Sequence, residues 1–155
     1  VGVKMEHKVD IVITTNSGAP LDLDFYQTCK GIDTASHITR DGGVIIIASS
    51  CCTGIGPEEF RVLHASASSP KEVLQKIRRE ELIGVQWENQ ALARIQLKND
   101  IYLVSDLDES IAKDMMITPI RTIEEGLQKA FKVLGDDAEI AIIPEGPLVL
   151  PLLEN

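Results

Sequence analysis

The sequence predicts an α/β fold, a three-layer αβα sandwich with a mainly parallel, Rossmann-like sheet of about five strands. Short apolar runs alternate with helical patterns along the chain, which is typical of successive strand–helix units. The apolar runs are continuous instead of alternating with polar residues, and such strands are usually covered by helices on both faces. A chain of 155 residues fits one domain, so we expect residues 1–155 to form a single α/β domain.

The expected strands coincide with the apolar runs, and the expected helices fill the longer segments between them. The strands are Val9–Thr14, Val44–Ser49, Ile101–Val104, Met116–Pro119 and Glu139–Ile143. The helices are approximately Leu21–Thr39, Pro57–Ala65, Pro70–Leu82, Gln86–Asn99, Glu109–Asp114 and Thr122–Leu134.

Residues with known preferences for helix ends support several of these boundaries. Gly42-Gly43 suits the exit from the first helix, and Pro57 and Pro70 suit the first turns of the second and third helices. The motif Thr122-x-x-Glu125 has the spacing of a capping box, and Gly135 suits the end of the helix that this box would begin.

Composition excludes several classes of protein. A net charge of −9 and a pI of about 4.8 disfavour binding to nucleic acids or to anionic membranes. The longest apolar run, Val44–Ala48, is too short to span a bilayer, and no signal peptide is visible. Cys29, Cys51 and Cys52 form no disulfide or metal-binding pattern, which favours a reducing cytoplasm.

Parallel α/β sheets bind ligands at the carboxyl ends of their strands. Four segments are expected to meet at that edge: Thr14–Ala19, Ser49–Gly56, Ser105-Asp106 and Pro144–Gly146. The first two are rich in residues that form tight turns and offer hydrogen bonds. This edge is therefore the default place for a ligand.

The first helix has two informative faces. One stripe is expected to pack on the sheet, and it contains Leu21, Phe25, Cys29, Ile32 and Ser36. A second stripe points the opposite way and contains Leu23, Tyr26, Gln27 and Lys30. Its mixture of apolar and polar side chains suggests contact with a ligand or with another domain. The alternative is a partly exposed face on which Lys30 pairs with Asp33.

Trp87 is the only tryptophan and lies near the start of an expected helix. On the helical wheel it falls with Ala91 and Arg94, away from the expected core stripe of Leu92 and Ile95. An indole in this position could form the wall of an apolar pocket. Alternatively, it covers the edge of the core.

Other motifs carry weaker signals. The turn Gly54-Ile55-Gly56-Pro57 lacks a full phosphate-binding pattern, so we interpret it as the start of a helix. Cys51 and Cys52 lack metal or redox spacing and are expected to be small buried residues. The three histidines lie in separate segments: His7, His37 and His64. The chain thus offers a binding edge and no complete catalytic set.

Several motifs, in order along most of the chain, resemble the C-terminal domain of nickel-dependent lactate racemases. They are Thr14–Gly31, Gly42–Ser49, Gly54-Ile55-Gly56, Gln86-Trp87-Glu88 and Ile142–Gly146. The resemblance implies a two-domain enzyme that racemises or epimerises a small 2-hydroxy acid by hydride transfer to and from a nickel-pincer nucleotide. It implies that the absent N-terminal domain holds this cofactor through a lysine and a histidine and supplies two catalytic histidines.

The resemblance also implies what this chain contributes. It would be the C-terminal domain that covers the substrate, with the N-terminal domain and the 2-hydroxy acid as its partners, and with no catalytic residue or metal ligand of its own. Four residues match the family's substrate pocket: Tyr26, Gln27, Lys30 and Trp87. Lys30 would attract the substrate carboxylate, Gln27 would hydrogen-bond the substrate, and the two aromatic rings would exclude water.

Two alternatives remain open at this point. The first is a non-catalytic, Rossmann-like binding or assembly module that uses the same helix face as a protein interface. The second is a self-contained nucleotide-binding domain.

Overall fold

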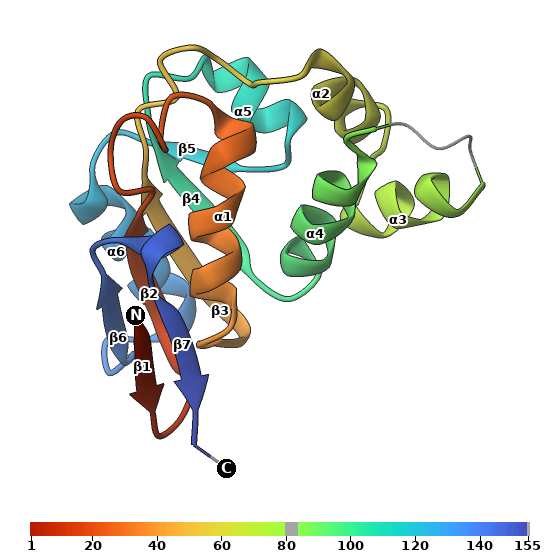
Figure 1. Ribbon diagram of the computed structural model, residues 1–155. Helices are drawn as coiled ribbons and strands as arrows, with labels where there is room; N and C mark the ends of the chain where they lie inside the picture. Colours follow the sequence, from red (N-terminus) through yellow and green to blue (C-terminus); the bar gives the residue numbers. More distant parts are fainter. Residues whose placement is uncertain (80–83, 155) are drawn as a thin grey trace.

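The computed structural model describes residues 1–79 and 84–154 (Figure 1). Its main sheet is parallel and five-stranded, in the order β5-β4-β3-β2-β6. These strands are β2 (Val9–Thr15), β3 (Thr39–Ala48), β4 (Asp100–Val104), β5 (Thr118–Ile120) and β6 (Ile140–Ile143). A separate pair of parallel strands, β1 (Gly2–Met5) and β7 (Leu150–Leu153), brings the two ends of the chain side by side.

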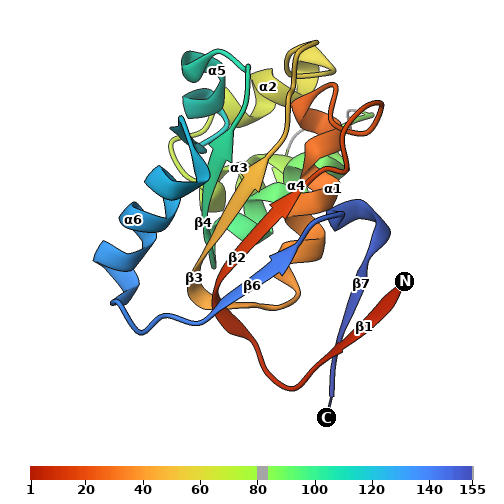
Figure 2. The same cartoon turned by 90° about the vertical axis from the view of Figure 1, so that its left-hand side faces the viewer.

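Helices cover both faces of the main sheet, as the sequence predicts. They are α1 (Phe25–Ser36), α2 (Glu58–Ala65), α3 (Pro70–Arg79), α4 (Gln86–Gln96), α5 (Glu109–Asp114) and α6 (Ile123–Leu134), with a short 3-10 turn, η1, at Gly146–Leu148. Figure 2 shows α6 on one side of the sheet and α1 and α4 on the other, together with the β1–β7 pair. The three-layer αβα arrangement is therefore confirmed.

The continuous apolar run in β3 has the structural reason that the sequence suggests. Ile45 and Ile47 belong to the larger core under α1 and α4, whereas Val44 and Ile46 belong to the smaller core under α6. All four side chains are fully buried because successive residues of a strand point to opposite faces and helices cover both.

The boundaries of α1 differ from the prediction at both ends. The helix begins at Phe25, not at Leu21, because the preceding residues form turns and the Asp24 carboxylate caps the helix by accepting a hydrogen bond from the Gln27 amide at 2.7 Å. It ends at Ser36, after which Thr39 already pairs with β2.

Gly42-Gly43 does not end a helix, so that prediction is wrong. Both glycines lie within β3, where the pairing with β2 is irregular, and Gly42 has a φ of 81°. A Cβ atom on Gly43 would lie 2.5 Å from the Asp10 carbonyl oxygen. The glycines therefore allow a bulge and a close approach of two strands.

The other helix ends follow the sequence signals more closely. Pro70 begins α3 as predicted, and the predicted end of this helix at Leu82 lies outside the described residues. Pro57 lies one residue earlier than expected, at the N-cap of α2. At α6, the Thr122 hydroxyl accepts a hydrogen bond from the Glu125 amide at 3.1 Å, and Gly135 ends the helix with a φ of 96°. Across the described residues, no helix is long and apolar enough to cross a membrane.

Candidate functional site

The loops at the carboxyl edge of the sheet meet as predicted. The Thr15 hydroxyl donates a hydrogen bond to the Pro144 carbonyl oxygen at 2.6 Å, and the Ser50 hydroxyl bonds the Asp106 carboxylate at 3.2 Å. A shallow cavity of about 530 Å³ lies over this edge; its lining includes Asp22, Ser50, Asp106 and Arg121.

The crevice in which this topology usually binds nucleotides is filled by the chain itself. Strand order reverses between β2 and β6, and ligands of doubly wound sheets bind at that point. Here η1 follows β6 and packs on α1. A Cβ atom on Gly146 would lie 2.7 Å from both the Thr14 hydroxyl and the Thr15 carbonyl oxygen. This filling argues against a self-contained nucleotide-binding domain.

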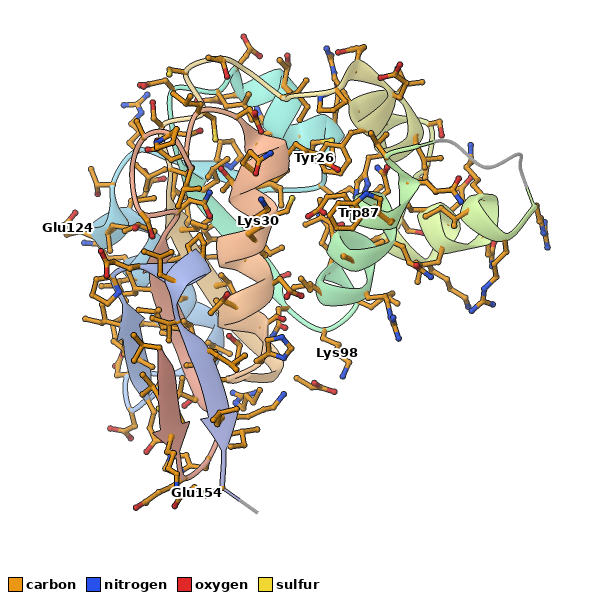
Figure 3. The ribbon with its side chains drawn as sticks, viewed as in Figure 1. Tyr26, Lys30, Trp87, Lys98, Glu124 and Glu154 are labelled. Atoms are coloured by element: carbon orange, nitrogen blue, oxygen red, sulfur yellow. The ribbon has the colours of Figure 1, made fainter. Side chains whose placement is uncertain are left out.

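A second cavity, of about 330 Å³, lies between α1, α4 and η1, and we call it the α1–α4 pocket. Its lining contains Lys30, Asp33, Thr34, Trp87, Glu88, Ala91 and Pro147. Figure 3 shows Tyr26 and Lys30 on α1 and Trp87 on the neighbouring helix α4. Residues that are far apart in the sequence thus share one pocket.

Lys30 supplies a cation to this pocket. Its ammonium group is solvent-exposed and donates a hydrogen bond to the Gln27 side-chain oxygen at 2.6 Å. The structure does not support the alternative in which Lys30 pairs with Asp33. The Asp33 carboxylate instead lies 3.6 Å from the His37 ring nitrogen. One bond to Gln27 orients the ammonium and leaves two of its three N–H donors for a ligand.

The indole of Trp87 forms an aromatic wall of the pocket. Tyr26 and Gln27, which the sequence also predicted there, contact Trp87 and Lys30 without lining the cavity themselves. The rings of Tyr26 and Trp87 meet edge to face with their centroids 6.0 Å apart, and Tyr26 in turn contacts the buried Phe60 at 5.4 Å. Tyr26 therefore links Trp87 to the core, and Trp87 remains 55% exposed. An indole that only covered the core edge would leave less of its surface in water.

The two predicted stripes of α1 hold within the helix except at Ser36, which was expected against the sheet but is only half-buried and lines a surface cavity. Phe25, Cys29 and Ile32 are buried against the sheet, and Tyr26, Gln27 and Lys30 face away from it. Leu21 and Leu23 belong to neither helical stripe because they precede the helix.

Glu88 is a pocket residue that the sequence reasoning missed. Its side chain is only 4% exposed, although it lines the same cavity as Lys30. Burial raises its pKa to about 7, opposed by a hydrogen bond from the Cys29 thiol and by the charge of Lys30. The helical spacing of Glu88 with Leu92 and Ile95 could have revealed this position, since both are core residues.

The histidines and cysteines form no catalytic arrangement in the described part of the chain. His64 is buried, and burial lowers its pKa; its ring nitrogens contact Gln96 and Asn89 at 2.9 and 3.1 Å. Among the residues that the structure describes, no cluster of three or more potential ligands could hold a metal ion.

The prediction that both adjacent cysteines are buried is wrong for one of them. Cys51 is buried, and Cys52 is exposed. Cys51 has a φ of 52°, so the chain turns there and directs the next side chain to solvent.

The fold and the α1–α4 pocket together define a class of α/β domain with a cationic, aromatic-walled cavity on one helical face. The sequence matches the family described as lactate racemase C-terminal domain over residues 4–150, and the chain belongs to this family. The resemblance seen in the sequence motifs is therefore confirmed.

Two lactate racemases are similar in sequence. That of Thermoanaerobacterium thermosaccharolyticum is 39% identical over 145 residues, covering 91% of this chain and 34% of that protein. That of Lactiplantibacillus plantarum is 36% identical over 141 residues, covering 88% of this chain and 33% of that protein. The chain thus spans about one third of the length of these relatives.

A solved structure is similar as well. The lactate racemase apoprotein from Thermoanaerobacterium thermosaccharolyticum superposes with a TM-score of 0.91 at 37% identity, over 95% of this chain and 36% of that one. The similarity extends across nearly all of the domain described above.

Proposed function

We propose that this chain binds and covers the substrate in a two-domain, cytoplasmic racemase or epimerase of 2-hydroxy acids. Membership of the lactate racemase family supports the class of reaction, and the span of about one third of the relatives supports a second domain. Free thiols at Cys29, Cys51 and Cys52 are consistent with a reducing compartment.

In this proposal the nickel-pincer nucleotide is held by the N-terminal domain. The described residues of this chain do not fit a nickel site, because they contain no cluster of potential ligands. We therefore assign no step at the metal to this domain. Its role is to bind the substrate, orient it and exclude water.

The observation that carries the proposal is a cation and an indole that line one pocket. The protein has a net charge of −9, so a small carboxylate needs a local cation to bind. Lys30 supplies it, Gln27 orients the ammonium at 2.6 Å, and Trp87, which contacts Tyr26, lines the same cavity. When a second domain closes over the pocket, water leaves and the ion pair strengthens.

Exposed apolar side chains on three strands support a partner domain. Side chains of β1, β6 and β7 remain more than two-fifths exposed; among them are Val3, Ile142, Leu150 and Leu152. Val3 and Ile142 line an apolar cavity of about 150 Å³ between the β1–β7 pair and the main sheet, whereas Leu150 and Leu152 do not line it. We propose that the N-terminal domain covers these side chains, since exposed apolar groups of this kind are typical of interfaces.

The experiment that tests the proposal replaces Lys30 in the two-domain enzyme. Lys30→Met removes the charge and keeps an unbranched side chain, so kcat/KM for lactate should fall by about 10- to 150-fold, the value of a charged hydrogen bond. Lys98→Met is the matched control, because Lys98 is also exposed and lies outside the pocket, paired with Asp41 at 3.4 Å (Figure 3). Equal activity of the two variants would remove Lys30 from the substrate site.

The alternative of a binding or assembly module retains one specific observation in its favour, the Trp87 side chain that is 55% exposed. Such a module would show no lactate turnover in the complete polypeptide, and Lys30→Met would weaken assembly instead of catalysis. Turnover measurements and analytical ultracentrifugation on the same samples separate the two functions.

A further inference from the structure

The α1–α4 pocket contains a buried carboxyl group where an anion is proposed to bind. Glu88 is 4% exposed and lines the pocket together with Lys30 and Trp87. It lies in the first turn of α4, on the buried side of the helix. Buried carboxyl groups are uncommon unless a partner or a function compensates for the lost hydration.

The groups that surround Glu88 explain how it can respond to a ligand. Helix α1 presents four titratable groups: Tyr26, Cys29, Lys30 and Asp33. The Cys29 thiol, whose pKa burial raises well above its usual value, stays protonated and donates a hydrogen bond to the carboxyl group. On helix α2, the His64 ring is bonded to Gln96 and Asn89 and does not line the pocket, to which η1 contributes the apolar Pro147.

Lys30 is the only one of the four α1 groups that carries a positive charge. Asp33 adds a negative charge nearby and, with burial, favours the neutral acid at Glu88, whereas Lys30 favours the ionised form. An ionised Glu88 therefore competes with an incoming carboxylate for the positive charge of Lys30, and it also repels that carboxylate. A protonated Glu88 does neither.

We infer that Glu88 is a positioning residue that acts through Lys30, and that the pocket takes up a proton on Glu88 when it binds a carboxylate anion. The inference rests on the proposed function, because it assumes that Lys30 binds the anion. The binding step balances as follows in protons. The free enzyme with ionised Glu88 binds one carboxylate anion and takes one proton from the buffer, and the resulting complex contains neutral Glu88. No bond within the substrate changes in this step.

The direction of the pH effect follows from the carboxyl pKa of about 7 in the free pocket. Below this pH the group is already neutral, so anion binding takes up little proton and affinity is at its highest. Above it, each bound anion must bring a proton, so affinity falls as pH rises. Between pH 6 and pH 8 the expected loss of affinity is about tenfold, and proton uptake at pH 8 approaches one per anion.

The test is isothermal titration calorimetry on the two-domain holoenzyme with racemic lactate, so that no net reaction accompanies binding. Titrations at pH 6, 7 and 8, each in two buffers of different ionisation enthalpy, give the affinity and the number of protons taken up. Glu88→Gln keeps the shape and is permanently neutral. It should retain the affinity of the wild type at pH 6 and lose both the pH dependence and the proton uptake.

The controls separate this inference from the proposed function. His37→Gln removes the titratable group beside Asp33 and should leave the proton uptake unchanged, since His37 does not line the pocket. Lactate affinity that is lost in Lys30→Met but independent of pH in the wild type would overturn the role of Glu88 and leave the proposed function standing. Lactate affinity unaffected by Lys30→Met would overturn both.

Discussion

Truncation of Trp87 should impair substrate turnover far more than it impairs stability. The indole is 55% exposed, and it forms an edge-to-face pair with Tyr26 at 6.0 Å. Such a pair contributes about 0.5–1.5 kcal/mol, so Trp87→Ala should lower the free energy of unfolding by about 1 kcal/mol.

The effect on turnover is larger because substrate and domain closure would bury the exposed part of the ring. A tryptophan buries about 150–250 Å² in total, so about 100 Å² remain to be covered. At about 25 cal/mol per Å² this area corresponds to about 2.5 kcal/mol, or up to about 70-fold in kcat/KM.

The assay compares steady-state racemisation of lactate with urea unfolding for each variant of the two-domain enzyme. Leu97→Ala is the matched control, because Leu97 caps the same helix, is 54% exposed and lies outside the pocket. The reasoning is refuted if Trp87→Ala and Leu97→Ala reduce kcat/KM equally, or if Trp87→Ala costs more in stability than in turnover.

Two further predictions concern the stability of the domain. Gly43→Ala should lower the free energy of unfolding by roughly 2 kcal/mol or more, because the new methyl group meets the Asp10 carbonyl oxygen at 2.5 Å. Gly84→Ala is the control, because a methyl group on Gly84 would lie in open space and should leave the stability unchanged. Urea titration measures both variants, and equal unfolding midpoints would contradict the close approach of the strands at Gly43. Burial lowers the pKa of His64, so the folded protein binds fewer protons than the unfolded chain and should lose stability as pH falls below about 6.5. The raised pKa of Glu88 has the opposite effect on the pH dependence of stability, so His64→Gln is compared with the protein that already carries Glu88→Gln. If His64→Gln leaves the pH profile of unfolding unchanged in this background, the lowered pKa of His64 is contradicted.

The sequence predicted those parts of the fold that depend on neighbouring residues in the chain. The run Val44–Ile47 is buried on both faces, and such a strand is recognised from its continuous apolar sequence alone. The pairing of β1 with β7 was not predicted, because it joins opposite ends of the chain and each strand has only four residues. The glycines at 42 and 43 were misinterpreted because a bulge and a helix exit require the same backbone freedom.

The candidate site shows the same division. Periodicity alone placed Tyr26, Gln27 and Lys30 on one face of a helix, whereas only the family resemblance joined them to Trp87. Contact between two helices depends on how both pack on the sheet, and helical periodicity says nothing about that packing. Glu88 was missed because an acidic residue in the first turn of a helix is normally expected in solvent, where it complements the helix dipole.

A crystal structure of the two-domain enzyme with a bound 2-hydroxy acid examines the anion-binding role of the pocket without reference to rates. The substrate carboxylate should lie about 3 Å from the Lys30 ammonium nitrogen, with the Trp87 ring against the ligand and out of solvent. A carboxylate bound at another place, with Lys30 still in water and Trp87 still exposed, would contradict the function proposed for this domain.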